Sequence, residues 1–141
     1  MSSGSASFSV RALGEVVLRT ARLDEMRSFY RDAIGLEVMR VFDGGMTFFR
    51  LARGFEGHTA VLALFPLDRG EDWQGHDQPR STLHHFALSI PHAERPDALA
   101  ALAARGLEPW TAFHEWVGWH SIYVKDPDGN TVELVSAPEP A

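Results

Sequence analysis

The hydrophobic and polar positions of the chain change period several times, and each change marks an expected element. Residues 13–19 form a short apolar run broken by one carboxylate, a pattern typical of a buried strand. The segment 23–34 then carries apolar side chains at helical spacing, and Gly35 follows where a left-handed C-terminal cap is expected. Glycine-containing turns separate three further strand-like segments, at 37–42, 46–52 and 58–65. The first half therefore predicts a βαβββ module.

The same order of elements begins again in the second half of the chain. A helix is predicted at 96–105, with strands before and after it at 83–90, 107–111, 121–126 and 131–136. The letters Gly-Leu-Glu follow both predicted helices, at 35–37 and at 106–108. Glu15 and His85 hold equivalent positions in the two first strands. This agreement predicts a duplicated module rather than an unrelated α+β chain.

Two such modules predict an α+β fold in which a curved mixed sheet surrounds a concave cleft. We expect one domain over 11–137, with module one at 11–65, a linker at 66–81 and module two at 82–137. The linker is polar and rich in turn-forming residues, and the small polar residues at 1–10 predict a disordered lead-in.

Composition and charge narrow the function classes. Of the 141 residues, 45% are hydrophobic and 23% are charged, as in an ordinary globular domain. The net charge of −6 and the lack of a basic run argue against partners such as nucleic acid or an anionic membrane. The absence of an apolar span and of a signal-peptide pattern favours a cytoplasmic protein. No cysteine is present, so His, Asp or Glu would have to hold any bound metal.

Three polar side chains stand at apolar strand positions. They are Glu15 and His85, in the first strands of the two modules, and Glu133, in the last strand. A buried carboxylate is costly without a partner, so we expect these groups to meet around a divalent metal ion, and the donor set suits Fe, Mn, Zn or Ni. His84 would then point to the opposite sheet face. The alternatives are that the carboxylates lie on solvated strand faces or that a carboxyl is protonated.

Three segments of the sequence resemble the vicinal oxygen chelate superfamily. They are the strand–helix segment VVLRTARLDEMRSFYRDAIGLE, the strand HHFALSI and the ending SIYVKDPDGNTVELV. This superfamily includes glyoxalase I, the extradiol ring-cleaving dioxygenases, fosfomycin-resistance thiol transferases and the bleomycin-resistance binding proteins. The resemblance implies a glyoxalase-like domain over residues 11–137 and a homodimer. It also implies metal ligands on the first and last strand of each module, which here are Glu15, Val61 or Ala63, His85 and Glu133.

Two features depart from the pattern of that superfamily. The first-strand ligand is most often His there, whereas it is Glu15 here. The four-ligand glyoxalase arrangement needs a carboxylate where this chain offers only Val61 or Ala63, so a full glyoxalase I ligand set is not expected. The ring-cleaving dioxygenases use two His and one carboxylate, and this chain would supply one His and two carboxylates.

Tyr123 and His114 are the expected catalytic residues beside the metal. Their spacing from Glu133 is similar to that of the acid/base Tyr and His of the ring-cleaving dioxygenases. A Tyr hydroxyl and an imidazole near a bound substrate could hold or transfer a proton. The alternatives are that Tyr123 packs in the core and that His114 is an exposed loop residue.

Aromatic residues are expected near the opening of the expected metal site. They could line a pocket for an aromatic or otherwise apolar ligand, or else form core or dimer contacts. They are Trp73, Trp110, Phe113, Trp116 and Trp119. The sequence thus favours a metal-dependent small-molecule enzyme of the glyoxalase or ring-cleaving dioxygenase type, which chelates vicinal oxygens of its substrate. The alternative is a metal-free ligand-binding protein like the bleomycin-resistance members, and a third possibility is an accessory domain without chemistry.

Overall fold

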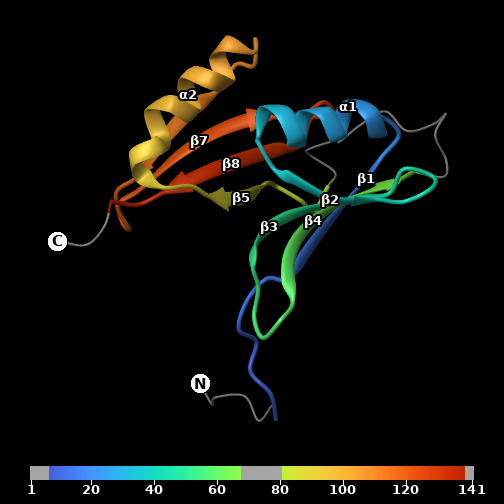
Figure 1. The fold of residues 1–141 in the computed structure, drawn as a ribbon. Coiled ribbons are helices and arrows are strands. Elements are labelled where there is room, and N and C mark those ends of the chain that lie inside the picture. Colours follow the sequence, from blue (N-terminus) through green and yellow to red (C-terminus); the bar gives the residue numbers. More distant parts are fainter. Residues whose placement is uncertain (1–6, 68–80, 139–141) are drawn as a thin grey trace.

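The computed structural model describes residues 7–67 and 81–138, and the chain follows the predicted order of elements (Figure 1). Module one contains β1 (Glu15–Thr20), α1 (Leu23–Ser28), the π-helical turn η1 (Phe29–Ala33), β2 (Glu37–Val41), β3 (Thr47–Arg53) and β4 (Thr59–Pro66). Module two contains β5 (Phe86–Ser89), the 3-10 turn η4 (His92–Glu94), α2 (Arg95–Ala104), β6 (Trp110–His114), β7 (Trp119–Lys125) and β8 (Thr131–Ser136). Residues 1–6 of the expected lead-in and most of the expected linker, including Trp73, lie outside the described residues.

Each module forms a four-stranded mixed sheet of the same topology. The strand order is β1-β4-β3-β2 in the first sheet, called sheet A here, and β5-β8-β7-β6 in the second, sheet B. In both sheets the first strand of the module runs parallel to the last, and the other pairs are antiparallel. Helices α1 and α2 lie on the same side of the strands (Figure 1). This repeated topology confirms the predicted α+β fold of two βαβββ modules.

Most predicted bounds lie within two residues of the observed ones, and β5, β6 and the first helix differ more. Strand β6 begins at Trp110 rather than at residue 107, because residues 107–109 carry the chain from the end of α2 to the edge of sheet B. The predicted helix 23–34 changes at Phe29 into a π-helical turn, in which the Ile34 amide donates to the Phe29 carbonyl over 3.1 Å. Helix α2 ends at Ala104, one residue before the predicted end. None of the helices in the described ranges is long and apolar enough to cross a membrane.

One hydrophobic core joins the two modules on the helix side of the sheets. Leu62 of sheet A and Val132 of sheet B are buried in the same cluster as Tyr30 of η1. The Tyr30 ring is fully buried and stacks on Phe86 of β5, with ring centroids 6.4 Å apart. Because side chains alternate along a strand, the other face of each sheet points away from this core.

A buried turn of module two fastens that module to module one. The Oδ1 atom of Asp126 accepts hydrogen bonds from the backbone amides of Asp128 and Asn130, both over 2.9 Å. Its Oδ2 atom accepts one from the Asn130 side chain at 2.8 Å and one from the Tyr30 hydroxyl at 2.7 Å. The single carboxylate of Asp126 therefore orders its own turn and links it to η1 of the other module.

The neighbouring carboxylate, that of Asp128, is buried at a cost. Its side chain has no exposed surface, and it forms an ion pair with Arg22 Nε at 3.8 Å. Burial raises the pKa of Asp128 above its usual value, although the Thr20 hydroxyl and the Arg22 guanidinium oppose the shift. The folded protein thus binds the Asp128 proton more tightly than the unfolded chain does. The protonated side chain stabilises the fold below the pKa that Asp128 has in the unfolded chain, and this stabilisation is lost as pH rises through its pKa in the folded protein.

We expect Asp128→Asn to raise the free energy of unfolding at pH 7.5 by about 1 kcal/mol, because it removes the buried charge. The difference from wild type should shrink toward pH 4, where the wild-type carboxyl is increasingly protonated in both states. Urea unfolding at both pH values measures it, with Asp43→Asn in an exposed turn as control. A gain of the same size at both pH values would contradict the role assigned to the charge.

Candidate functional site

Polar and aromatic side chains gather on the face of sheet B that points away from the core. Val132 and Leu134 of β8 belong to the core, so Glu133 between them projects to the opposite face. The strand register aligns Glu133 with Tyr123 of β7, and Tyr123 with Trp110 of β6. These three residues therefore form one row across the sheet, which we call the Glu133 row.

Glu133 is held by two partners at one end of this row. Its Oε1 atom lies 2.9 Å from Nε2 of His85, and its Oε2 atom accepts a 2.6 Å hydrogen bond from the Ser121 hydroxyl. Only 6% of Glu133 is exposed, and Ser121 is fully buried, whereas a third of the His85 side chain is exposed. The carboxylate is thus fixed by β7, and its contact with His85 is open to the surface.

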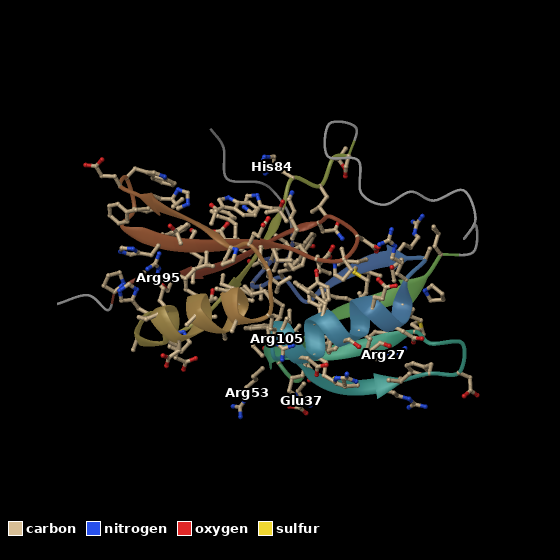
Figure 2. The ribbon with its side chains drawn as sticks, turned by 90° about the horizontal axis from the view of Figure 1, so that it is seen from above. Arg27, Glu37, Arg53, His84, Arg95 and Arg105 are labelled. Atoms are coloured by element: carbon tan, nitrogen blue, oxygen red, sulfur yellow. The ribbon has the colours of Figure 1, made fainter. Side chains whose placement is uncertain are left out.

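His84 does not point away from His85 as the alternation of a strand predicts. The Nδ1 atoms of the two rings lie 2.8 Å apart, a hydrogen bond whose direction depends on the tautomers. Strand β5 begins only at Phe86, so neither histidine is held in strand geometry, and this part of the prediction was wrong. His84 lies near the start of β5, away from α1 and α2 (Figure 2).

Tyr123 and His114 are brought together, as their spacing suggested. The Tyr123 hydroxyl lies 3.2 Å from Nε2 of His114, which is half-buried at the end of β6 rather than exposed in a loop. The Tyr123 ring stacks on Trp110 at 5.5 Å between centroids, and it lies 6.0 Å from the His85 ring. The two predicted catalytic residues therefore stand beside the His85–Glu133 pair, while their roles stay a prediction.

Glu15 stands on the other sheet. It is the exposed first residue of β1, an edge strand of sheet A, and its partner across the strands is Val61. In residues 7–67 and 81–138 of the single chain, no three His, Asp or Glu side chains form a cluster that could hold a metal ion. Two of the three predicted ligands meet, and the third does not join them within one chain.

The His85–Glu133 pair fits half of a metal site. Two neighbouring ligands about 2.1 Å from one ion in octahedral geometry lie about 3 Å from each other. The 2.9 Å between His85 Nε2 and Glu133 Oε1 agrees with that spacing, and it is equally the length of a direct hydrogen bond between the two side chains. Ser121 holds the second carboxylate oxygen, as partners of metal ligands commonly do. The sequence analysis did not predict the bond from Ser121 to Glu133, which depends on the register of β7 and β8.

Comparison with known proteins relates this site to one family. Residues 12–134 match the family model described as the Glyoxalase/Bleomycin resistance protein/Dioxygenase superfamily. The Biphenyl-2,3-diol 1,2-dioxygenase 2 of Rhodococcus globerulus is 31% identical over 126 residues, which cover 84% of this chain. The match covers 59% of that relative, so the chain spans less than two thirds of the relative's length.

Solved structures share the fold. A glyoxalase/dioxygenase from Nostoc punctiforme aligns with a TM-score of 0.73 at 20% identity, over 99% of both chains. A mutant of the fosfomycin resistance protein FosX from Listeria monocytogenes, complexed with Mn(II) and 1S,2S-dihydroxypropylphosphonic acid, aligns with a TM-score of 0.66 at 17% identity, over 94% of both chains. The sequence match and the paired βαβββ sheets confirm the resemblance, and the chain belongs to the Glyoxalase/Bleomycin resistance protein/Dioxygenase superfamily.

Proposed function

We propose that this protein is a divalent-metal-dependent enzyme that acts on a small molecule with two neighbouring oxygens. The observation that carries the proposal is the 2.9 Å contact between His85 and Glu133 on an open sheet face, next to a Tyr–His pair. The family supports metal-assisted chemistry, and the FosX relative was solved with Mn(II). The reaction would be of the glyoxalase or ring-cleaving dioxygenase type.

His85, Glu133 and Glu15 would hold the ion, which when bound acts as a Lewis acid on substrate oxygens and, if it is iron, allows oxygen chemistry. Ser121 orients Glu133 by donating to its Oε2 atom. Tyr123 stands beside His85, and its hydroxyl can hold or move a proton that His114 accepts or returns at Nε2. The flat Trp110–Tyr123 stack borders the same face and suits a planar substrate.

Glu15 would come from a second copy of the chain. It lies on the exposed end of an edge strand, beside Val17, which is 44% exposed on the same strand face. Within one chain Glu15 joins no cluster of metal-binding side chains in the described ranges, so a homodimer in which sheet A of one copy faces sheet B of the other would complete the site.

An aromatic diol is the substrate class we propose. The relative from Rhodococcus globerulus carries the name of a biphenyl-2,3-diol dioxygenase, and its matched part covers most of this chain. The aromatic side chains of Trp110 and Tyr123 at the His85–Glu133 pair agree with a planar ring next to the metal.

Elemental analysis of purified protein loaded with Fe, Mn, Zn or Ni tests the metal. Wild type should retain about one ion per chain after desalting, and Glu133→Gln should retain little, because the amide loses the charge of a ligand. Glu115→Gln, at an exposed position of the β6–β7 hairpin, is the control and should bind as wild type does. No bound metal in wild type would overturn the proposal.

Mixing two inactive variants tests the shared site. Glu15→Gln and Glu133→Gln each lose metal, but a mixed dimer has one site with neither substitution. Random mixing should restore about a quarter of the wild-type metal content and activity. If the mixture stays as empty as the separate variants, the three ligands come from one chain or the ligand set is wrong.

A second candidate function is metal-free ligand binding. It is favoured by the contacts of Glu133, whose two oxygens both have partners without any ion. Under this function a cationic or aromatic ligand would bind the open face, and wild type would hold no metal. The elemental analysis decides between the two.

A further inference from the structure

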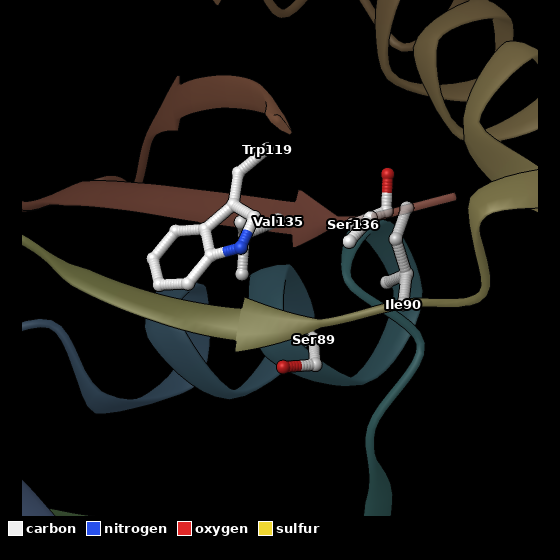
Figure 3. A pocket seen from close by; sticks show the side chains of 6 residues that line it. Ser89, Ile90, Trp119, Val135 and Ser136 are labelled. Carbon is white, nitrogen blue, oxygen red and sulfur yellow. The ribbon is translucent and has the colours of Figure 1, made fainter. Parts of the chain in front are cut away.

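A pocket opens on sheet B beside the candidate site, where β5 and β8 end and β7 begins (Figure 3). Its volume is about 230 Å³. The lining comes from three neighbouring strands and from the residues that follow β5 and β8: Ser89, Ile90, Trp119, Val135, Ser136 and Ala137.

The pocket continues the face that carries Glu133. Val135 lies two residues after Glu133 on β8, so both side chains project to the same face, about 7 Å apart. The register places Ser121, the partner of Glu133, opposite Val135, and Ser89 on the other side of Val135. The row Ser89–Val135–Ser121 therefore lies directly beside the Glu133 row.

The chemistry of the lining selects an uncharged group. Trp119 lies above Val135 and Ser89, and 45% of its surface is exposed (Figure 3). No charged side chain lines the pocket among the described residues, so a charged substituent would lose water without gaining a partner. An apolar cavity of about 150 Å³ is large enough to hold benzene, so this pocket has room for a phenyl ring or a short alkyl chain.

We propose that this pocket binds an uncharged aryl or alkyl substituent of the substrate, and that Trp119 determines specificity for it. The inference rests on the proposed function only for the position of the substrate oxygens at His85 and Glu133. The substrate would then have two parts, an oxygen-bearing head at the Glu133 row and an apolar group about 7 Å along β8.

Binding of a matched series of probes tests the inference. Dissociation constants are measured by calorimetry for catechol and for catechols carrying an alkyl or phenyl group next to the diol. In wild type the phenyl compound should bind more tightly than catechol. Trp119→Ala should reduce the ratio of the Kd of catechol to the Kd of the phenyl compound about tenfold. Ser89→Leu, which fills the pocket from an exposed position, should reduce it as well.

Trp116→Ala is the matched control. Trp116 is 82% exposed and lies 6.2 Å from the Trp119 ring, but it does not line the pocket. Its substitution should leave the ratio unchanged. The inference is overturned if neither pocket variant changes the ratio, or if the control lowers it equally.

Failure of the inference can be distinguished from failure of the proposed function. In metal-free protein, toluene should shift the NMR signals of the Trp119 indole and the Val135 methyl groups. If wild type binds no metal but toluene shifts these signals, the proposed function is wrong and the pocket stands. If metal binds and toluene causes no shift, the pocket assignment is wrong and the proposed function stands.

Discussion

Replacing Asp126 with alanine is expected to lower the free energy of unfolding by about 4 kcal/mol. Its carboxylate accepts four hydrogen bonds, two of them from backbone amides of its own turn and one from the fully buried Tyr30 hydroxyl. Alanine leaves these donors buried without an acceptor, and each unpaired group costs about 1–3 kcal/mol. Water that enters the turn would recover part of that loss.

Urea unfolding followed by circular dichroism measures this effect. Asp43→Ala, in an exposed turn of module one, is the control and should stay within about 0.5 kcal/mol of wild type. Tyr30→Phe removes one of the four bonds and should cost about 1–2 kcal/mol, which places it between the two. An Asp126→Ala variant as stable as the control would show that the turn does not fasten the modules.

If the protein is the metal-dependent enzyme proposed above, Tyr123→Phe should lower its kcat toward an aromatic diol about 100-fold while metal content is unchanged. Phenylalanine keeps the ring that stacks on Trp110 but removes the hydroxyl, which lies 3.2 Å from His114. If this hydroxyl handles a proton together with His114, the two substitutions act on one step and their effects should not add.

A double-mutant cycle with His114→Gln measures this coupling. We expect the double variant to be about as slow as Tyr123→Phe alone, and the pH dependence of kcat to change in all three variants. Metal analysis and the unfolding midpoint serve as controls for an intact fold. Fully additive losses, or a Tyr123→Phe variant with wild-type kcat, would show that the pair only packs.

The sequence pattern predicted the face of sheet B well, because strand alternation is a local property. Counting along a strand places Glu133 between two core residues of β8. The same counting places Tyr123 and Ser121 on one face of β7. The bond from Ser121 to Glu133 is a property of register, which sequence spacing alone did not supply. The pattern also predicted the first strand of each module but not the residue at which it begins. His84 and His85 were therefore assigned to β5, which begins only at Phe86.

The position of Glu15 could not be predicted from the same reasoning. Its own strand and face follow from the alternation, but its distance from Glu133 depends on the angle between the two sheets. That angle is set by contacts far apart in the sequence, among them Tyr30 with Phe86 and with Asp126. Similarly, Trp119 and Trp116 look alike in sequence, and only the hairpin geometry separates the pocket wall from the exposed tip.

The bond between Tyr30 and Asp126 lies on the core side, whereas Glu133 and its partners lie on the opposite face. In the proposed dimer a ligand would touch sheet B of one copy and sheet A of the other, and the Tyr30–Asp126 junction in each copy holds these two sheets in place without contacting the ligand. Thermodynamic linkage is reciprocal, so tight closure of the junction strengthens such binding by the same factor by which binding tightens the junction. Substitutions that weaken the Tyr30–Asp126 bond would then lower the affinity for a ligand on the opposite face of the sheet.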